Sequence, residues 1–333
     1  FVYFVNLQDE VLAWLATSEG LRAHRIPLSS AALVRATESF RNAILRGDDL
    51  DDLRPAGQRL YRALLEWVDP TRMRRLIVVP DGPLAVMPFG ALVDPRTGRF
   101  LAETTEIAFA QALSPTEPSR TTARGTIALV AGPSNVGRPL PAVSGELRDV
   151  AKLYNTADVL SGSAATVQAL RRVVEKAQLL HFAGHAEANS VLPSASYLML
   201  APDPSHPKGW LTAEEIAQWR APNLELVVLS ACETAAGVAY RGDGVASLAR
   251  PFFTAGANAV VGTIWKVEDK ATSRLLTAFH RNLAEDKQPV RALQRAQRAA
   301  ILSADPSARL PRNWAGVLIT VRAIDVQFSV RPR

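Results

Sequence analysis

A thiol and an imidazole each follow an apolar segment of the kind that forms a buried strand. Cys232, the single cysteine of the chain, comes after ELVVLS at 225–230, and His185 comes after QLLHFA at 178–183. Open α/β sheets place reactive side chains at the carboxyl ends of their strands, so these two face each other if the strands are neighbours. A thiolate is a nucleophile that needs a basic neighbour to form at neutral pH. The pair therefore predicts attack by Cys232 on a carbonyl group, with His185 as general base and acid.

A plainer interpretation of the thiol has to be set against this one. A lone cysteine is more often a small buried hydrophobe than a nucleophile. Cys232 differs from that pattern because it follows its strand instead of lying inside it. The residues around it, SA before and ET after, suit a turn. We therefore favour the reactive thiol, with backbone N–H groups at the strand end available to hold an oxyanion.

A second histidine, His181, lies inside the same apolar segment as the first. Its neighbours Leu180 and Phe182 are apolar, which favours a core or supporting histidine. A spacing of four residues along a strand separates His181 from His185 by roughly 13 Å, too far for one metal ion. No third ligand follows at a convincing spacing, so we expect no metal and no other cofactor.

Two other motifs favour structural roles. RGDG at 241–244 opens a predicted helix but lacks the Lys-Ser/Thr of a phosphate-binding loop, so a tight turn is favoured. Arg291, Arg295 and Arg298 form a basic stripe on a helix, but no aromatic residues are interleaved with them. We interpret the stripe as a solvated face and expect no direct binding of nucleic acid.

The elements that must position these residues change in character along the chain. The first part predicts strands at 1–6, 11–17, 21–26 and 76–79 and helices at about 30–46 and 59–68. Residues 114–125 (SPTEPSRTTARG) form the most loop-like stretch, so we place a boundary there, between subdomains at 1–120 and 121–333. After the boundary, strands alternate with helices. The strands are at 127–131, 178–183, 225–230, 259–264 and 317–321, and the helices at about 145–154, 166–175, 212–219, 244–255, 269–285 and 289–302. This alternation predicts a mainly parallel sheet covered by helices on both faces.

Composition excludes several classes of protein. The chain has 333 residues, 48% of them hydrophobic and 21% charged, as in an ordinary globular protein. A single cysteine excludes an internal disulfide scaffold and favours a reducing compartment. No apolar run reaches the roughly 18 residues of a membrane span. The start, FVYFVNLQDE, has neither an initiator Met nor a signal peptide, so we expect it to be part of a longer protein. A net charge of +6 permits an acidic partner without requiring one.

Several sequence blocks, in order, resemble the CHAT family of caspase-like cysteine peptidases. They are PDGPL at 80–84 with MPF at 87–89, LHFAGHA at 180–186, LSACET at 229–234, GDGV at 242–245 with AGA at 255–257, VGTIW at 261–265 followed by Val267 and Asp269, and NWA at 313–315. LSACET with the upstream histidine is the specific signal, and the other blocks are individually weak.

The resemblance implies a fold, a site and a setting. The fold is a caspase-like three-layer α/β/α sandwich with a mainly parallel sheet, preceded by a degenerate caspase-like half. Cys232 is the expected nucleophile and His185 the base, with the backbone N–H groups of Ala186 and Cys232 in the oxyanion hole. Members of the family usually carry tetratricopeptide repeats and are related to separase. The implied setting is the bacterial cytoplasm, in defence or regulated proteolysis, where an upstream repeat domain or a partner switches on cleavage of a protein substrate.

Two departures from the family pattern affect the site. Ala186 stands where the family usually has glycine, which excludes any backbone angle that only glycine tolerates. Lys266 follows Trp265, where the family often has proline and separase has aspartate, and it can neutralise Glu268 and Asp269. The candidates for substrate binding are Asp243, Trp265, Lys266, Glu268 and Asp269. Their charges predict a weak preference for a basic residue before the scissile bond.

Two other functions fit the same residues. One is a catalytically inactive caspase-like module that binds partners, and irreversible labelling of Cys232 distinguishes it from a peptidase. The other is a cysteine-dependent hydrolase or acyl-transferase that acts on small molecules, which shows activity on esters or small amides without any preference for a peptide sequence.

Overall fold

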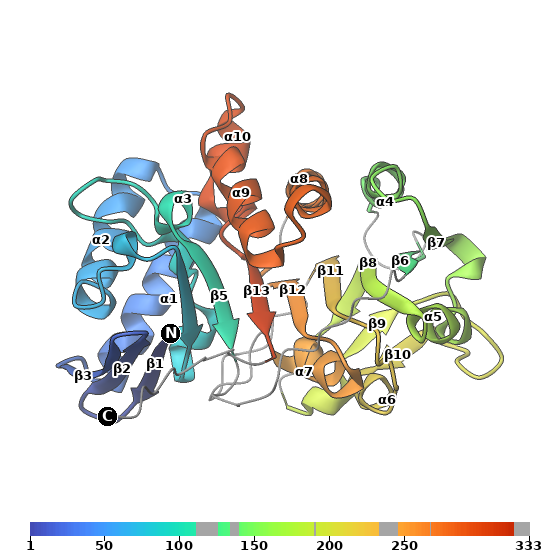
Figure 1. The fold of residues 1–333 in the computed structure, drawn as a ribbon, viewed down its shortest axis with the longest axis horizontal. Coiled ribbons are helices and arrows are strands. Elements are labelled where there is room, and N and C mark those ends of the chain that lie inside the picture. Colours follow the sequence, from blue (N-terminus) through green and yellow to red (C-terminus); the bar gives the residue numbers. More distant parts are fainter. Residues whose placement is uncertain (111–125, 134–139, 190, 233–245, 267, 323–333) are drawn as a thin grey trace.

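One large sheet runs through the whole molecule (Figure 1). The computed structural model describes residues 1–110, 126–133, 140–189, 191–232, 246–266 and 268–322. In that part of the chain the sheet has thirteen strands. Eleven follow the order β10-β9-β8-β11-β12-β13-β5-β4-β1-β2-β3, β6 pairs with β8, and β7 pairs with β6. The strands are β1 (Val2–Asn6), β2 (Val11–Thr17), β3 (Gly20–Ile26), β4 (Arg75–Val79), β5 (Glu106–Ala110), β6 (Thr126–Ala131), β7 (Ala157–Leu160), β8 (Ala177–Glu187), β9 (Tyr197–Met199), β10 (Trp210–Thr212), β11 (Leu226–Cys232), β12 (Ala259–Thr263) and β13 (Val317–Val321).

The pairing of these strands confirms the predicted mainly parallel sheet. β6, β8, β11 and β12 are mutually parallel neighbours, and β5, β4 and β1 form a second parallel group. β13 joins the groups, antiparallel to β12 and parallel to β5. All strands from the first 110 residues thus lie at one end of the sheet. The division near residue 120 remains a prediction, because residues 111–125 lie outside the described part of the chain.

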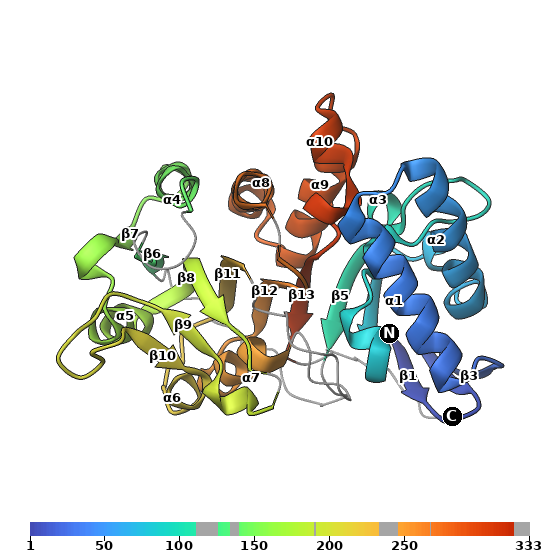
Figure 2. The same ribbon diagram turned by 180° about the vertical axis from the view of Figure 1, so that it is seen from behind.

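Helices cover both faces of the sheet. They are α1 (Ser30–Arg46), α2 (Leu50–Leu64), α3 (Leu101–Thr104), α4 (Val143–Ala151), α5 (Val167–Val174), α6 (Ala213–Ala217), α7 (Ala246–Ala255), α8 (Asp269–Asp286), α9 (Pro289–Ile301) and α10 (Pro306–Arg309). Around β8 and β11, buried residues of α4, α8 and α9 pack on one face and those of α5, α6 and α7 on the other. Figures 1 and 2 show the first group above the sheet and α6 and α7 below it. We call the first face the α4–α8 face.

Most predicted elements are confirmed, and their ends are where the predictions fail. The helix predicted at 59–68 instead runs from Leu50 to Leu64. Asp51 and Asp52 supply a favourable acidic first turn, and the helix includes Pro55, a residue type that disfavours helix in a sequence pattern. Thr212 and Glu215 form a capping box at the start of α6, since the Thr212 Oγ1 accepts from the Glu215 N–H and the Glu215 carboxylate accepts from the Thr212 N–H. The short strands β5, β7, β9 and β10 were not predicted.

Candidate active site

The two residues with the clearest chemistry occupy paired positions on neighbouring strands. β8 and β11 are parallel, and their register pairs Cys232 with His185. The backbones of paired residues on adjacent strands lie roughly 5 Å apart. The condition set by the sequence, that the two strands be neighbours, is therefore met.

Both residues lie within their strands and not just beyond them, which corrects the prediction. β8 continues to Glu187 because Ala186 and Glu187 pair with the antiparallel strand β9. The sequence suggested an earlier end because Gly184 resembles a turn residue. A glycine inside a strand instead marks a close backbone approach. Here the approaching backbone is that of Gly132, next to the end of β6.

The contact between Gly132 and Gly184 leaves no space for a side chain. A Cβ atom at Gly184 would lie 3.0 Å from Phe182 Cζ and 3.1 Å from both Cα and N of Gly132. We expect Gly184→Ala to lower the free energy of unfolding by about 1–3 kcal/mol, since a packed backbone has to shift. Denaturant unfolding measures this change. The neighbouring variant Ala186→Gly is the control, and a loss for Gly184→Ala no larger than for the control would contradict the packing argument.

Strand alternation places His185 on the α4–α8 face. Leu179 and Ala183 of β8 belong to the core on that face, whereas Leu180 and Phe182 belong to the core on the other. His185 has the same parity as Ala183 and is half-buried. Its Nε2 atom is buried and has no hydrogen-bond partner in the part of the chain that the structure describes. The ring thus keeps one buried nitrogen whose partner has to be accounted for.

Four residues before His185, a chain of buried polar side chains runs beneath the site. Tyr154 Oη lies 2.8 Å from His280 Nδ1, and His280 Nε2 lies 3.0 Å from His181 Nδ1. His181 Nε2 is 3.0 Å from Glu146 Oε1, although the angles do not complete a hydrogen bond. Both histidines are fully buried and Glu146 is nearly so. One proton order fits: Tyr154 donates to His280, His280 donates to His181, and the remaining His181 N–H faces the Glu146 carboxylate.

This series of buried polar side chains links α4, α8 and β8. It includes residues that the sequence analysis missed. Burial lowers the pKa of His280 well below its usual value, with a contribution from His181, so His280 stays neutral. A signal for His280 was present, because it lies on the apolar stripe of α8 between Leu276 and Leu283. Glu146 carried no such signal beyond its place in an amphipathic helix. For His181, full burial agrees with the predicted core or supporting role.

Asp269 is the predicted substrate-binding residue that the structure connects to His185. It is the first residue of α8, and its Oδ2 accepts a hydrogen bond from the Ala142 N–H at the start of α4, at 2.8 Å. Burial raises the pKa of Asp269. The charge of Glu146 raises it further, whereas the Ala142 N–H and the charge of His185 lower it. The carboxyl group therefore lies within electrostatic reach of both the buried chain and the imidazole.

The other candidates for substrate binding lie in different surroundings. Trp265 is buried at 1% exposure, its Nε1 donates to the Arg312 carbonyl at 3.0 Å, and Gly316 packs closely against its ring. We therefore no longer propose Trp265 as a substrate contact. Lys266 and Glu268 are exposed. Asp243 lies outside the described residues.

The departure at Ala186 is compatible with the backbone. Among the described residues other than glycine, only Asp69 and Lys287 have a positive φ. Ala186 is buried in β8 and pairs with Leu198 of β9. Its backbone is therefore ordinary β structure that any residue adopts, and its N–H is not lost by the change from glycine.

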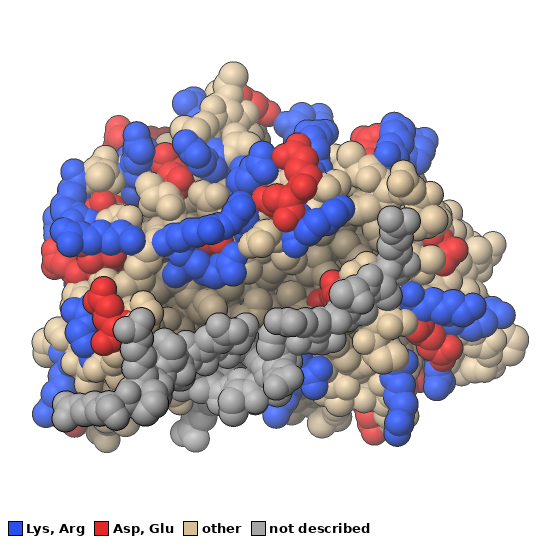
Figure 3. Space-filling model, viewed as in Figure 1, with Lys and Arg blue, Asp and Glu red and all other residues tan. Residues whose placement is uncertain are grey.

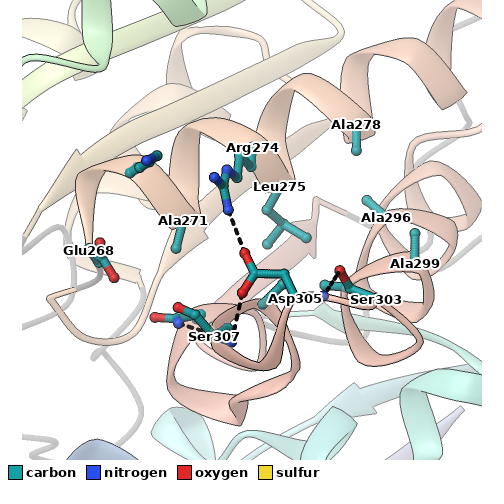
Figure 4. Close-up of a pocket in the computed structure, with 14 residues that line it drawn as sticks. Glu268, Ala271, Arg274, Leu275, Ala278, Ala296, Ala299, Ser303, Asp305 and Ser307 are labelled. Carbon is teal, nitrogen blue, oxygen red and sulfur yellow. Dashed lines mark hydrogen bonds and ion pairs between the residues drawn. The ribbon is translucent and has the colours of Figure 1, made fainter.

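A cavity of about 380 Å³ lies among α8, α9 and α10, alongside the N-terminal half of α8 (Figure 4). Six of its fourteen lining residues are alanines, and an ion pair joins Arg274 and Asp305 at 2.8 Å. Glu268 lies at its edge. The lining has no nucleophile paired with a base, so we assign it no chemistry. No group of three His, Cys, Asp or Glu side chains that could hold a metal ion occurs in the described ranges.

Lys and Arg side chains are numerous over the upper half of the face seen in Figure 3, with acidic side chains among them. The basic stripe on α9 is only partly solvated. Arg291 Nε donates to Glu106 Oε1 at 3.0 Å, and Arg74 and Arg75 pair with the same carboxylate. Arg295 and Arg298 are exposed, as predicted. Where the structure is described, no helix is both long enough and apolar enough to cross a bilayer.

Known proteins resemble this chain at three levels. A family model described as the CHAT domain matches residues 54–322. Tetratricopeptide repeat protein 28 is 25% identical over 309 residues in Mus musculus and 25% identical over 299 residues in Homo sapiens. These matches cover 78% and 74% of this chain, and 12% of each relative. The chain therefore spans about an eighth of the length of these curated relatives.

Two solved structures are similar to this chain. The Saccharomyces cerevisiae separase–securin complex has a TM-score of 0.50 at 13% identity, covering 74% of this chain and 15% of the other. The Arg-specific cysteine proteinase gingipain R has a TM-score of 0.48 at 13% identity, covering 80% and 67%. At this identity the first likeness concerns the fold alone. It agrees with the predicted caspase-like sandwich and mainly parallel sheet.

Proposed function

Because this chain belongs to the CHAT domain family, we propose that it is a cysteine endopeptidase that cleaves a protein substrate with a Cys232–His185 dyad. The observation that carries the proposal is the strand register that pairs these two residues on neighbouring strands. We propose that the imidazole at the paired position takes the proton of the thiol. No third member is required for the dyad to act.

The proposed reaction has two steps. The thiol of Cys232 gives its proton to His185, and the sulfur attacks the carbonyl carbon of the scissile peptide bond. The C–N bond then breaks, and His185 returns the proton to the leaving amine. Water next attacks the thioester with His185 as base, which releases the new carboxylic acid and restores the thiol. The N–H groups of Ala186 and Cys232 are the proposed donors to the oxyanion in both steps.

Substrate preference is the finer part of the proposal. Asp243 and Glu268 are proposed to favour a basic residue before the scissile bond, and the exposed Lys266 weakens that preference through its like charge. Such charges discriminate mainly through complementary potential, so the preference should weaken as the salt concentration rises.

Regulation is proposed to come from repeats or a partner. The curated relatives are tetratricopeptide repeat proteins and are much longer than this chain. The separase structure is a complex with securin. We therefore propose that an upstream repeat region or a protein partner controls the peptidase. A cytoplasmic location and a role in bacterial defence or regulated proteolysis complete the proposal, because they are what the family resemblance implies.

A diverse peptide library tests the proposed activity. The protein and its Cys232→Ala variant are incubated with the library, and the products are identified by mass spectrometry. Cleavage by the unaltered protein alone supports the peptidase and gives the residue preferred before the scissile bond. Equal cleavage by both proteins contradicts it.

The inactive interaction module is distinguished by labelling. A nucleophilic thiol reacts irreversibly with iodoacetamide faster than a free thiol does at pH 6, because its thiolate persists there. We expect Cys232 to react in this way and His185→Ala to slow the reaction. No reaction at Cys232, together with no cleavage, supports the inactive module.

A further inference from the structure

Two helices cover the face of β8 that carries His181 and His185. α4 supplies Glu146 and α8 supplies His280, and both side chains reach His181. α8 follows β12, which runs parallel to β11 and β8, so the helix returns in the opposite direction to β8. The N-terminal end of α8 therefore lies towards the carboxyl end of β8.

The spacing brings Asp269 level with His185. From His181 to His185, the strand rises by roughly 13 Å. From His280 back to Asp269, the helix rises by roughly 16 Å. Since His280 and His181 are in direct contact, Asp269 lies at about the height of His185. The Ala142 N–H holds the Asp269 carboxyl group there from the start of α4.

A buried ring nitrogen of His185 needs a hydrogen-bond acceptor, which a carboxylate is able to supply. His185 Nε2 is buried and has no hydrogen-bond partner among the described residues. A buried polar atom without a partner is costly, and catalytic hydrogen bonds often tighten only when substrate binds. Burial raises the pKa of Asp269, and His185 acts on the same pKa by lowering it.

We propose that Asp269 is a positioning residue that accepts a hydrogen bond from His185 Nε2–H, leaves Nδ1 to take the Cys232 proton, and stabilises the resulting imidazolium. This inference rests on the proposed peptidase function. It gives Asp269 a role towards the base, in place of the substrate contact expected from the sequence.

Glu146, at one end of the series of buried polar side chains, acts on the ionisation of this carboxyl group. The described charged groups that face Asp269 are Glu146 on α4, His185 on β8 and Glu268 at the start of its own helix. Burial and the negative charge of Glu146 raise the pKa of Asp269. Removing that charge lowers the pKa, so Asp269 ionises at a more acidic pH.

The test measures kcat/KM against pH for three variants. We expect Asp269→Asn to lower kcat about 10- to 100-fold at pH 7–8, equally for all residues before the scissile bond. The difference from the unaltered protein should vanish as the pH falls below the Asp269 pKa. Glu146→Gln should keep the maximal rate and move the acidic limb to lower pH, by up to roughly one unit. Glu285→Gln, at the far end of α8, is the matched control. A change in substrate preference at constant kcat for Asp269→Asn overturns the inference.

Nuclear magnetic resonance keeps this test independent of cleavage. In protein labelled with ¹⁵N-histidine, the ring shifts show which nitrogen carries the proton. We expect His185 to be protonated at Nε2, and Asp269→Ala to give a mixture of tautomers. An unchanged tautomer overturns the inference even if peptides are cleaved, whereas absent cleavage with a changed tautomer contradicts the proposed function alone.

Thermal stability gives a second test. The change in Tm of Asp269→Asn at pH 7 would have the opposite sign if Asp269 formed a stabilising ion pair. Because the folded-state pKa of Asp269 is raised, its ionisation costs stability fully above that pKa, and the cost disappears only as the pH falls below the pKa of the unfolded state. Asp269→Asn, which still accepts from Ala142, should raise Tm at pH 7 and leave it unchanged at pH 3. A lower Tm at pH 7 contradicts the assignment.

Discussion

Replacing Cys232 with alanine is expected to abolish peptide cleavage, lowering kcat/KM by about 10³-fold or more. The nucleophile forms the covalent bond of the first step, so the other groups of the site have nothing to activate once the sulfur is gone. The comparison uses a peptide selected from the library and equal protein concentrations. An alanine variant that cleaves as fast as the unaltered protein rules out the proposed function.

The folded state serves as the control for this variant. Alanine is slightly smaller than cysteine, and β11 is held on both sides by β8 and β12. We expect the melting temperature to change by only a few degrees. Cys232→Ser keeps a hydroxyl group of similar size and should be nearly as inactive, because serine is a far weaker nucleophile without an added base. If a variant loses cleavage only because it unfolds, its melting temperature falls.

The second large effect is expected when the two histidines of β8 are replaced one at a time. His185→Ala should lower kcat/KM by at least about 10³-fold with little loss of stability, because this half-buried ring transfers the proton. His181→Ala should instead lower the free energy of unfolding by about 3 kcal/mol. It removes a fully buried ring and leaves His280 Nε2 and the Glu146 carboxylate without a partner.

The two alanine variants serve as controls for each other, since His181 and His185 lie on the same face of β8, four positions apart. Cleavage at saturating substrate and urea unfolding are measured on each variant. His181→Gln, which retains a polar end, should recover part of the stability. A loss of activity in His181→Ala at full stability contradicts the supporting role of His181. A large loss of stability in His185→Ala contradicts the assignment of stability to His181 and of proton transfer to His185.

Local patterns were enough to predict most of the secondary structure. β2 alternates between buried and partly buried residues, and Thr212 with Glu215 forms the capping box that their spacing indicates. Where an element depends on its neighbours, local patterns failed. β8 continues past Gly184 because β9 pairs with its end, and no residue near Gly184 indicates where β9 will lie.

The sequence by itself determined which side chains could do chemistry and that His181 would be buried, because residue type and apolar periodicity are local properties. Only the tertiary structure decided that Cys232 and His185 share a register, that Trp265 belongs to the core, and that Asp269 accepts a hydrogen bond from the start of α4. It also brought Glu146 of α4 and His280 of α8 to His181, and Tyr154 to His280. The physical reason is that strand pairing and helix packing minimise the free energy of the whole sheet, and the residues that meet are chosen by packing over long sequence separations.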